Sequence, residues 1–252
     1  MSIQAGVGIS KNKNAREAGI EATKEALARG ALERADVLIA FASVSFNQDE
    51  LVVGIREAGG EAVLFGCTDA GEITGAGPSE KSVAVMAIKS DTIRFTAGLG
   101  EGVKEKGARE AGRDVARTVR ERVQGDLRAF IMLPDVLSGN GADAVRGVLD
   151  ELGEHFPVVG GAPGDDFLFQ KTYQYQNDKV VSGAVAGLGL SGKFSMGIGV
   201  RHGWVPIGMP MKVTKAEGAV LYELDGRPAI SMYEDYFGPR ADDLRKEALA
   251  RM

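Results

Sequence analysis

An internal repeat restricts the fold of this chain more than any other feature. Residues Lys11–Gly19 read KNKNAREAG, and residues Lys104–Gly112 read KEKGAREAG, 93 positions later. Five further blocks match in the same order, which predicts duplication of one folding unit. These pairs are Ala5–Gly8 with Ala97–Gly100, Val37–Phe41 with Ala129–Leu133, Leu51 and Ile55 with Val145 and Leu149, Val63–Cys67 with Pro157–Gly161, and Ser82–Val85 with Ser182–Val185.

A third copy begins after the second and does not finish. Met196–Gly199 resembles the opening strand of each repeat, and Thr214–Glu217 introduces another apolar run. The chain then stops at Met252, so either a longer parent protein has been cut here or the third unit is degenerate. We expect one domain over 1–195, with repeats at roughly 3–96 and 97–195, and an incomplete unit over 196–252.

Each repeat reads as strand, helix, strand, helix, strand, strand. Asn14 and Asn47 are each followed by a glutamate three residues later, the spacing of a capping box, which predicts helices from there to Gly30 and Gly59. Val37–Ala42 is apolar on both faces, as expected for a strand covered on both sides. Ser90 and Asp91 separate two strand-like segments and predict a tight hairpin.

These elements predict an α/β fold. It would contain mixed sheets flanked by helices, built from two tandem β-α-β-α-β-β repeats and a partial third. Two strands joined through a helix would pair in parallel, and two strands joined by a hairpin would pair antiparallel, so each sheet would be mixed.

Charge and composition exclude several classes of function. The net charge of −5 argues against a nucleic-acid partner, which requires a basic surface. The longest apolar runs are about six residues, far short of the roughly 18 that a membrane helix needs, so we expect no membrane partner. The single cysteine, Cys67, rules out an internal disulfide and suits a reducing cytoplasm, where we place the protein.

No cofactor or metal ion is expected. Gly187–Gly192 matches the dinucleotide pattern G-x-G-x-x-G, but the residues after it look like a strand, whereas the pyrophosphate would need a helix there. One cysteine and two distant histidines provide no spacing typical of a transition-metal site.

Two glycine-rich loops follow the third strand of each repeat and form the main candidate site. The loops are Gly66–Gly75 and Gly160–Asp166. Ligands of open α/β sheets bind beyond the carboxyl ends of strands, where glycine lets the backbone approach closely. The candidate lining residues here are Cys67, Thr68, Glu72, Gly161, Asp165 and Asp166. The alternative is that the glycines only allow tight turns and the acids only cap neighbouring elements.

A third candidate segment follows a predicted strand over Phe194–Val200. Arg201 and Trp204, with His202 between them, suit a small ligand that carries a carboxylate and an apolar part. The alternative is a tryptophan packed at a strand end beside an exposed arginine.

Taken together, these segments resemble the FIST domain family of intracellular sensory proteins. The resemblance lies in Gly66–Ile73, Val158–Asp166, His202–Gly208, Val213–Gly218 and Tyr222–Ala229. It implies a FIST N-terminal-type domain over 1–195 and the beginning of a FIST C-terminal-type unit over 196–252. It also implies a small-molecule sensor, with amino acids or related compounds as ligands, coupled to a signalling protein or an output domain.

The leading hypothesis is a sensory domain that binds a small polar ligand and relays its occupancy to a signalling partner. An alternative is an amidase or cyclic-amide hydrolase with Cys67 or Thr68 as the nucleophile, which would need a base within reach. A third hypothesis is an interaction scaffold without a closed pocket.

Overall fold

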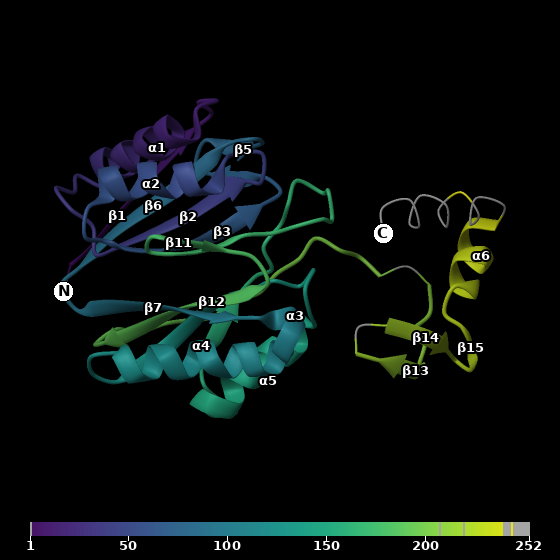
Figure 1. Cartoon of the computed structure of the whole chain (residues 1–252). Coiled ribbons are helices and arrows are strands. Elements are labelled where there is room, and N and C mark those ends of the chain that lie inside the picture. Colours follow the sequence, from purple (N-terminus) through teal and green to yellow (C-terminus); the bar gives the residue numbers. More distant parts are fainter. Residues whose placement is uncertain (1, 207, 219, 239–242, 244–252) are drawn as a thin grey trace. The chain divides into compact units, whose positions relative to one another are not determined.

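The computed structural model describes residues 2–206, 208–218, 220–238 and 243, and the chain divides into two compact units. Unit 1 comprises Met1–Met196, and unit 2 comprises Gly197–Met252. The helices and strands of both units are labelled in Figure 1. None of the described helices has both the length and the apolar character needed to cross a bilayer.

Unit 1 contains two mixed β-sheets. The first has six strands in the order β1-β6-β2-β3-β10-β11, and the second has four strands in the order β7-β12-β8-β9. The strands of the first sheet are β1 (Ile3–Ser10), β2 (Val37–Ser43), β3 (Val63–Asp69), β6 (Val83–Ser90), β10 (Gln174–Gln176) and β11 (Lys179–Val181). The strands of the second are β7 (Ile93–Glu101), β8 (Leu127–Pro134), β9 (Val158–Gly160) and β12 (Ala184–Gly192).

Helices cover the outer face of each sheet, as Figure 1 shows. Helices α1 (Ala15–Arg29) and α2 (Gln48–Gly59) pack on the first sheet, and α4 (Ala108–Arg122) and α5 (Gly141–Leu152) pack on the second. The inner faces of the two sheets meet in a third apolar cluster that includes Phe65, Ala97 and Leu188. Unit 1 therefore has four layers, and the predicted α/β fold of mixed sheets flanked by helices is confirmed.

The predicted hairpin around Ser90 and Asp91 is wrong. Strand β6 pairs with β1 and β2 on its two sides, whereas β7 pairs with β12 in the other sheet. Both hydrogen-bonding edges of β6 are already occupied, so β7 has no edge of β6 to join. The two residues instead carry the chain from one sheet to the other.

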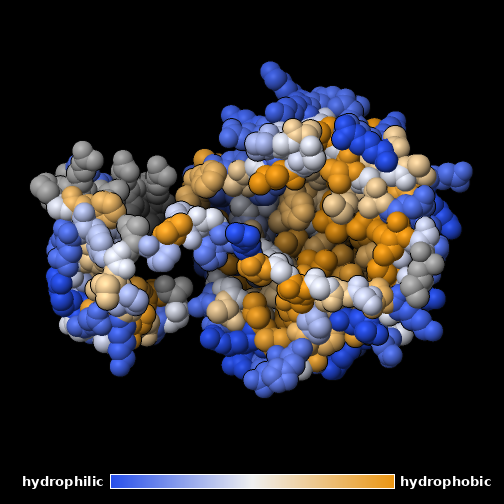
Figure 2. All heavy atoms as spheres, turned by 180° about the vertical axis from the view of Figure 1, so that it is seen from behind, coloured by the Kyte–Doolittle hydropathy of each residue, from blue (hydrophilic) through white to orange (hydrophobic). Residues whose placement is uncertain are grey.

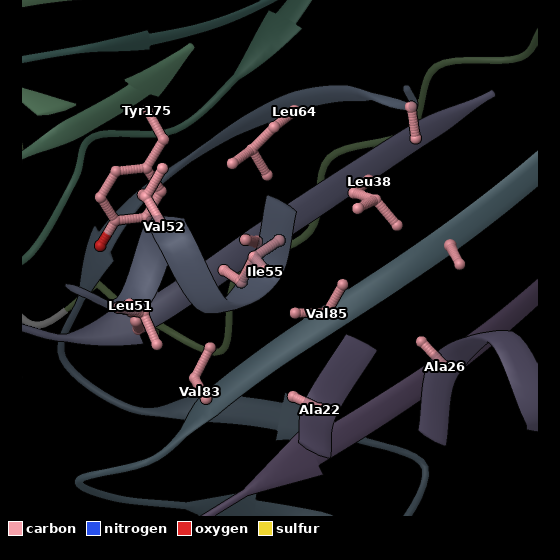
Figure 3. Packing of buried hydrophobic residues seen from close by; sticks show 14 of the residues in the cluster. Ala22, Ala26, Leu38, Leu51, Val52, Ile55, Leu64, Val83, Val85 and Tyr175 are labelled. Atoms are coloured by element: carbon pink, nitrogen blue, oxygen red, sulfur yellow. The ribbon is translucent and has the colours of Figure 1, made fainter. Parts of the chain in front are cut away.

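The helix starts follow the sequence signals. The Asn14 side chain accepts a hydrogen bond from the Glu17 amide at 3.0 Å, and the Asn47 side chain accepts one from the Glu50 amide at 3.2 Å. Such caps satisfy amides that would otherwise lack partners in the first turn. The capped helices bury a compact set of hydrophobic side chains against β2, β3, β6 and β10, seen in Figure 3: Ala22, Ala26, Leu38, Leu51, Val52, Ile55, Leu64, Val83, Val85 and Tyr175.

Glycines allow unusually close helix packing in both halves of unit 1. A Cβ atom at Gly54 would lie 2.0 Å from the carbonyl oxygen of Arg16, and one at Gly147 would lie 1.9 Å from that of Arg109. The matching of Leu51 with Val145 is off by one residue, because Val145 is exposed and its neighbour Ala144 occupies the buried position. The duplication itself stays a prediction.

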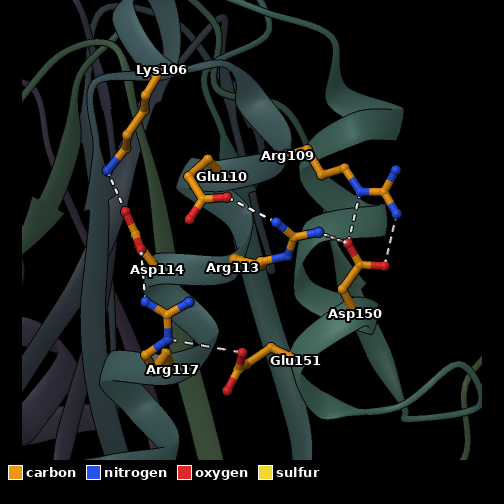
Figure 4. A network of polar contacts seen from close by, with 8 residues as sticks. All are labelled: Lys106, Arg109, Glu110, Arg113, Asp114, Arg117, Asp150 and Glu151. Carbon is orange, nitrogen blue, oxygen red and sulfur yellow. Dashed lines mark hydrogen bonds and ion pairs between the residues drawn. The ribbon is translucent and has the colours of Figure 1, made fainter.

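Ion pairs link the same helices on their solvent side. Arg16 contacts Glu57 at 2.6 Å across α1 and α2, and Arg109 contacts Asp150 at 2.7 Å across α4 and α5. The second pair belongs to a wider network that also includes Arg113 (Figure 4). Exposed pairs of this kind contribute little stability each, so the helix packing depends mainly on the close apolar contact.

Three shorter elements complete unit 1, and unit 2 contains a small sheet and a helix. The unit 1 elements are β4 (Glu72–Thr74), β5 (Gly77–Ser79) and α3 (Val103–Lys106); those of unit 2 are β13 (Val213–Glu217), β14 (Val220–Leu224), β15 (Arg227–Pro228) and α6 (Ser231–Phe237). The predicted strand over Phe194–Val200 is wrong, because this segment pairs with no described strand and Val200 is 91 % exposed. Met196 and Ile198 are exposed as well, by 43 % and 52 %.

Candidate functional site

An apolar cleft of about 700 Å³ opens between the two sheets of unit 1. Strand β3 packs against β7 and β12 of the narrower sheet. Four strands cannot cover the whole inner face of six, so part of β6 and β1 stays open and Met86 is 39 % exposed. Seen from behind in Figure 2, hydrophobic side chains gather in a hollow between the two halves of this unit.

Both sheets contribute to the walls of this inter-sheet cleft. The first sheet supplies apolar side chains of β1, β2, β3 and β6, and the second supplies those of β8. The lining residues are Val7, Ile39, Phe41, Phe65, Cys67, Ala84, Val85, Met86, Ile131 and Leu133, with Asp69, Ile73, Thr74, Gly75, Gly160, Gly161 and Ala162 at the loops. A volume of this size suits a small organic molecule.

The two predicted glycine-rich loops touch each other at this cleft, although the prediction of a loop is wrong for Gly66–Asp69, which forms the end of β3. The Gly164 amide donates to the carbonyl oxygen of Thr68 at 3.0 Å, and the Asp166 amide donates to that of Asp69 at 3.2 Å. A Cβ atom at Gly164 would lie 2.9 Å from the Ala70 amide nitrogen, so glycine is required for this approach. Residues of both loops line the cleft, and so the two segments form one continuous rim.

Asp165 holds the turn that follows the second loop. Its buried carboxylate accepts hydrogen bonds from the amides of Phe169, Gln170 and Lys171 at 2.9, 2.6 and 3.0 Å. Asp166, Phe167 and Phe169 have positive φ angles of 55°, 62° and 55°, which are strained for these residue types. The hydrogen bonds to the carboxylate offset this strain. They thereby hold the backbone of the turn that supports the rim of the cleft.

Asp69, Glu72 and Asp166 form a cluster of carboxyl groups at the rim. Burial, followed by the charge of Glu72, raises the pKa of Asp69 from 3.8 to about 7. Burial also raises the pKa of Glu72, although a hydrogen bond from the Ser82 hydroxyl opposes that shift. Asp166 accepts a hydrogen bond from the Ser43 hydroxyl at 2.6 Å.

Asp69 and Glu72 interact directly. Asp69 Oδ1 and Glu72 Oε1 are buried and have no other hydrogen-bond donor among the described residues, and a hydrogen bond between the two side chains raises the pKa of Asp69. A proton held between the two carboxyl groups satisfies both oxygens, since like charges at this distance are unfavourable. With its pKa of about 7, Asp69 keeps this proton below neutral pH and loses it as the pH rises above 7.

Cys67 lines the cleft as a small apolar side chain. It is 2 % exposed, and burial together with the nearby Asp69 raises the pKa of its thiol well above 9.0. A thiol becomes a nucleophile only as the thiolate, and this environment favours the protonated form. The geometry therefore favours a packing role for the Cys67 side chain and does not activate its thiol as a nucleophile.

The structure brings together some of the candidate site residues and gives others supporting positions. Cys67 and Gly161 line the cleft. Thr68 is buried, and its hydroxyl accepts a hydrogen bond from the Tyr173 amide at 3.0 Å. Glu72, Asp165 and Asp166 lie at the rim in the contacts described above. Whether any of these residues binds a ligand stays a prediction.

Arg201 and Trp204 belong to unit 2. Both are exposed, Trp204 by 85 %, and neither lies in a helix or strand. Their part in a binding site stays a prediction.

Sequence reasoning missed several residues that shape the cleft. Phe41, Phe65 and Leu133 were assigned only to buried strands, although their side chains face the opening between the sheets. Asp69 lies inside the first glycine-rich loop and was passed over in favour of Glu72. Its position as the last residue of β3, at the carboxyl end of a strand parallel to β2, is the signal that could have identified it.

Comparison with known proteins identifies relatives over most of the chain. The model of the family described as FIST N domain matches residues 36–227. An uncharacterized protein of Mycobacterium tuberculosis is 28 % identical over 235 residues, which are 90 % of this chain and 58 % of that protein. An uncharacterized protein of Methanocaldococcus jannaschii is 38 % identical over 93 residues, 36 % of this chain and 18 % of that protein. The chain thus spans less than two thirds of the length of these relatives.

Among solved structures, the crystal structure of a cyanuric acid hydrolase from A. caulinodans aligns with this chain. The TM-score is 0.40 and the sequence identity is 9 %, with 77 % of this chain and 72 % of that chain covered.

Proposed function

The chain belongs to the FIST N domain family, and from this membership we propose that unit 1 is a sensory domain that binds a small molecule in the inter-sheet cleft. The ligand we propose is an amino acid or a related small compound. Its occupancy is relayed to a signalling protein or an output domain, and the protein acts in the cytoplasm without nucleic-acid or membrane partners.

The inter-sheet cleft is the observation that carries this proposal. It is about 700 Å³ in volume, its walls are apolar, and its polar groups are concentrated at one rim. Binding sites for small molecules typically combine an apolar interior with a few polar groups that fix orientation.

The position of the cleft also supports the relay. Its walls come from both sheets, and its rim includes the β4–β5 hairpin and the loop after β9. A ligand that contacts both sheets binds more tightly to the conformation in which the sheets lie close together than to one in which they lie further apart. This difference in affinity between two conformations is what a ligand needs in order to send a signal. The hairpin and the loop are therefore the segments whose mobility should change on binding.

The hydrolase alternative has less support. Cys67 is buried with a raised thiol pKa, and the Thr68 hydroxyl is engaged by the Tyr173 amide. A nucleophile needs an activating base, and no histidine lies among the described residues that line the cleft.

The test is isothermal titration calorimetry of the whole chain against a panel of amino acids and their simple derivatives. We expect saturable binding of at least one compound. Hydrogen exchange should then show slower exchange of residues 70–79 and 160–171 in the bound protein.

A cleft-blocking variant provides the matched comparison. No atom lies within 4 Å of a Cβ placed at Gly161, so the backbone there accepts a side chain, and Gly161→Phe adds a large one at the cleft rim. Gly199→Phe adds the same side chain at an equally open position in unit 2. Loss of binding in the first variant alone supports the proposal; equal binding by both variants, or no binding by the wild-type chain, refutes it.

A further inference from the structure

We propose that the ligand of the inter-sheet cleft is a small amine with an apolar body and no carboxylate, held by an ion pair between its ammonium group and Asp69. This inference rests on the proposed function, because it names the chemical class that the same site selects. The proposed function allows an amino acid or a related small compound as the ligand. The inference selects the related amines, which lack the carboxylate.

The charge of the cleft is one-sided. Asp69 is its only charged lining residue in the described part of the chain, and no lysine, arginine or histidine side chain accompanies it. Glu72 and Asp166 add further negative charge to the same rim, and both raise the pKa of Asp69. The local potential therefore attracts a cation and repels an anion.

A carboxylate would find no cationic side chain among the described residues that line this space. Removing an ionised carboxylate from water is unfavourable unless a cation or several donors receive it. The walls consist of side chains such as Ile39, Phe41 and Leu133, which donate no hydrogen bonds. In a free amino acid bound through its ammonium group at Asp69, the neighbouring carboxylate would lie beside the carboxyl groups of Glu72 and Asp166, which repel it, whereas the corresponding amine has no such group.

The arrangement at Asp69 suits an ammonium group. The carboxyl group lies where the apolar walls meet the rim, and the Asp69–Glu72 pair holds one proton below the Asp69 pKa of about 7. An arriving ammonium group replaces that proton as the positive partner of the pair, so the pair releases it to solvent. The apolar part of the amine then fills the space between Phe41, Phe65 and Leu133.

The experiment compares matched probes on the whole chain by calorimetry at pH 7.5. The aromatic set is 2-phenylethylamine, phenylalanine, 3-phenylpropionic acid and 2-phenylethanol; the aliphatic set is isopentylamine, leucine, 4-methylpentanoic acid and isopentanol. In each set we expect the amine to bind at least tenfold more tightly than the acid or the amino acid.

Asp69→Asn separates charge recognition from apolar packing. We expect this variant to bind the amines at least tenfold more weakly and the neutral alcohols unchanged. Titration of the wild-type chain at pH 6.5, below the Asp69 pKa of about 7, in buffers of different ionisation enthalpy should also reveal a proton released on amine binding.

Two results overturn the inference. Tighter binding of the acid or the amino acid than of the amine, with loss of binding in Gly161→Phe, would reject the amine class and leave the proposed function intact. Absence of binding by every probe in both sets would also reject the amine class, whereas the proposed function fails only when the wider panel described above fails too.

Discussion

The Asp166 amide donates a hydrogen bond to the carbonyl oxygen of Asp69 across 3.2 Å. These two residues are 97 positions apart in the sequence; Asp69 ends β3 of the first sheet, and Asp166 follows β9 of the second sheet. Their contact joins the two glycine-rich loops into one rim and brings two carboxyl groups to the opening of an apolar cleft.

Replacing Asp69 with asparagine should stabilise unit 1 at high pH. The pKa of Asp69 is about 7 in the folded protein against an ordinary value of 3.8. Between those values the folded protein binds more protons than the unfolded chain, so the free energy of unfolding falls as pH rises. We expect Asp69→Asn to be more stable than the wild type at pH 8 by on the order of 1–2 kcal/mol, allowing for solvent screening, with the difference vanishing near pH 4.

Chemical denaturation at both pH values measures this difference, and Asp150→Asn is the control with the opposite sign. Arg109 and Arg113 lower the pKa of Asp150 to about 2, so its charged form is favoured in the folded protein above the unfolded pKa. That variant should be less stable than the wild type at neutral pH. If the difference in the free energy of unfolding between Asp69→Asn and the wild type is the same at pH 4 and pH 8, the interpretation of Asp69 as a buried carboxyl group is contradicted.

Replacing Gly54 with alanine should separate the two helices that cover the first sheet. The new Cβ would lie 2.0 Å from the Arg16 carbonyl oxygen, a contact that only a backbone shift can relieve. We expect a loss of about 1–3 kcal/mol in the free energy of unfolding, and the same for Gly147→Ala in the second half. Gly199→Ala, at an open position, should change it by less than about 0.5 kcal/mol. Urea denaturation followed by circular dichroism provides these values.

Removing the Asp165 carboxylate should loosen the turn behind the rim. Asp165→Ala leaves three amides without their acceptor. It also removes the hydrogen bonds that offset the backbone strain at Phe167 and Phe169, whose φ angles are positive. We expect a loss of about 2–3 kcal/mol and faster hydrogen exchange over residues 166–171. Asp178→Ala, which removes an exposed carboxylate, should be nearly neutral. Unchanged exchange in Asp165→Ala would show that the turn does not depend on this side chain.

The Cys67 thiol should react slowly in the folded protein. It is buried, and its pKa is raised, so both access and the thiolate fraction are low. Reaction with a coloured disulfide reagent at pH 7 should be at least a hundredfold slower than for the same chain in denaturant. A folded-state rate above that of free cysteine would instead indicate an activated thiolate and revive the hydrolase alternative.

Local sequence signals determined the secondary elements of this protein. Asn14 and Asn47 begin helices because their side chains reach amides only three residues away, and continuous apolar runs such as Val37–Ala42 form strands covered on both sides. The same signals fixed the α/β class, since strands that alternate with helices must form helix-covered sheets.

Only the tertiary structure decided how the strands are shared between sheets and where a ligand could enter. Ser90 and Asp91 look like a hairpin turn, but whether β7 joins β6 depends on whether β1 and β2 have already occupied both edges of β6. The cleft likewise arises because a four-stranded sheet is packed against a six-stranded one, and Asp69 acquires its pKa from burial beside Glu72. Strand competition, sheet width and burial depend on residues far apart in the chain, so no local pattern contains them.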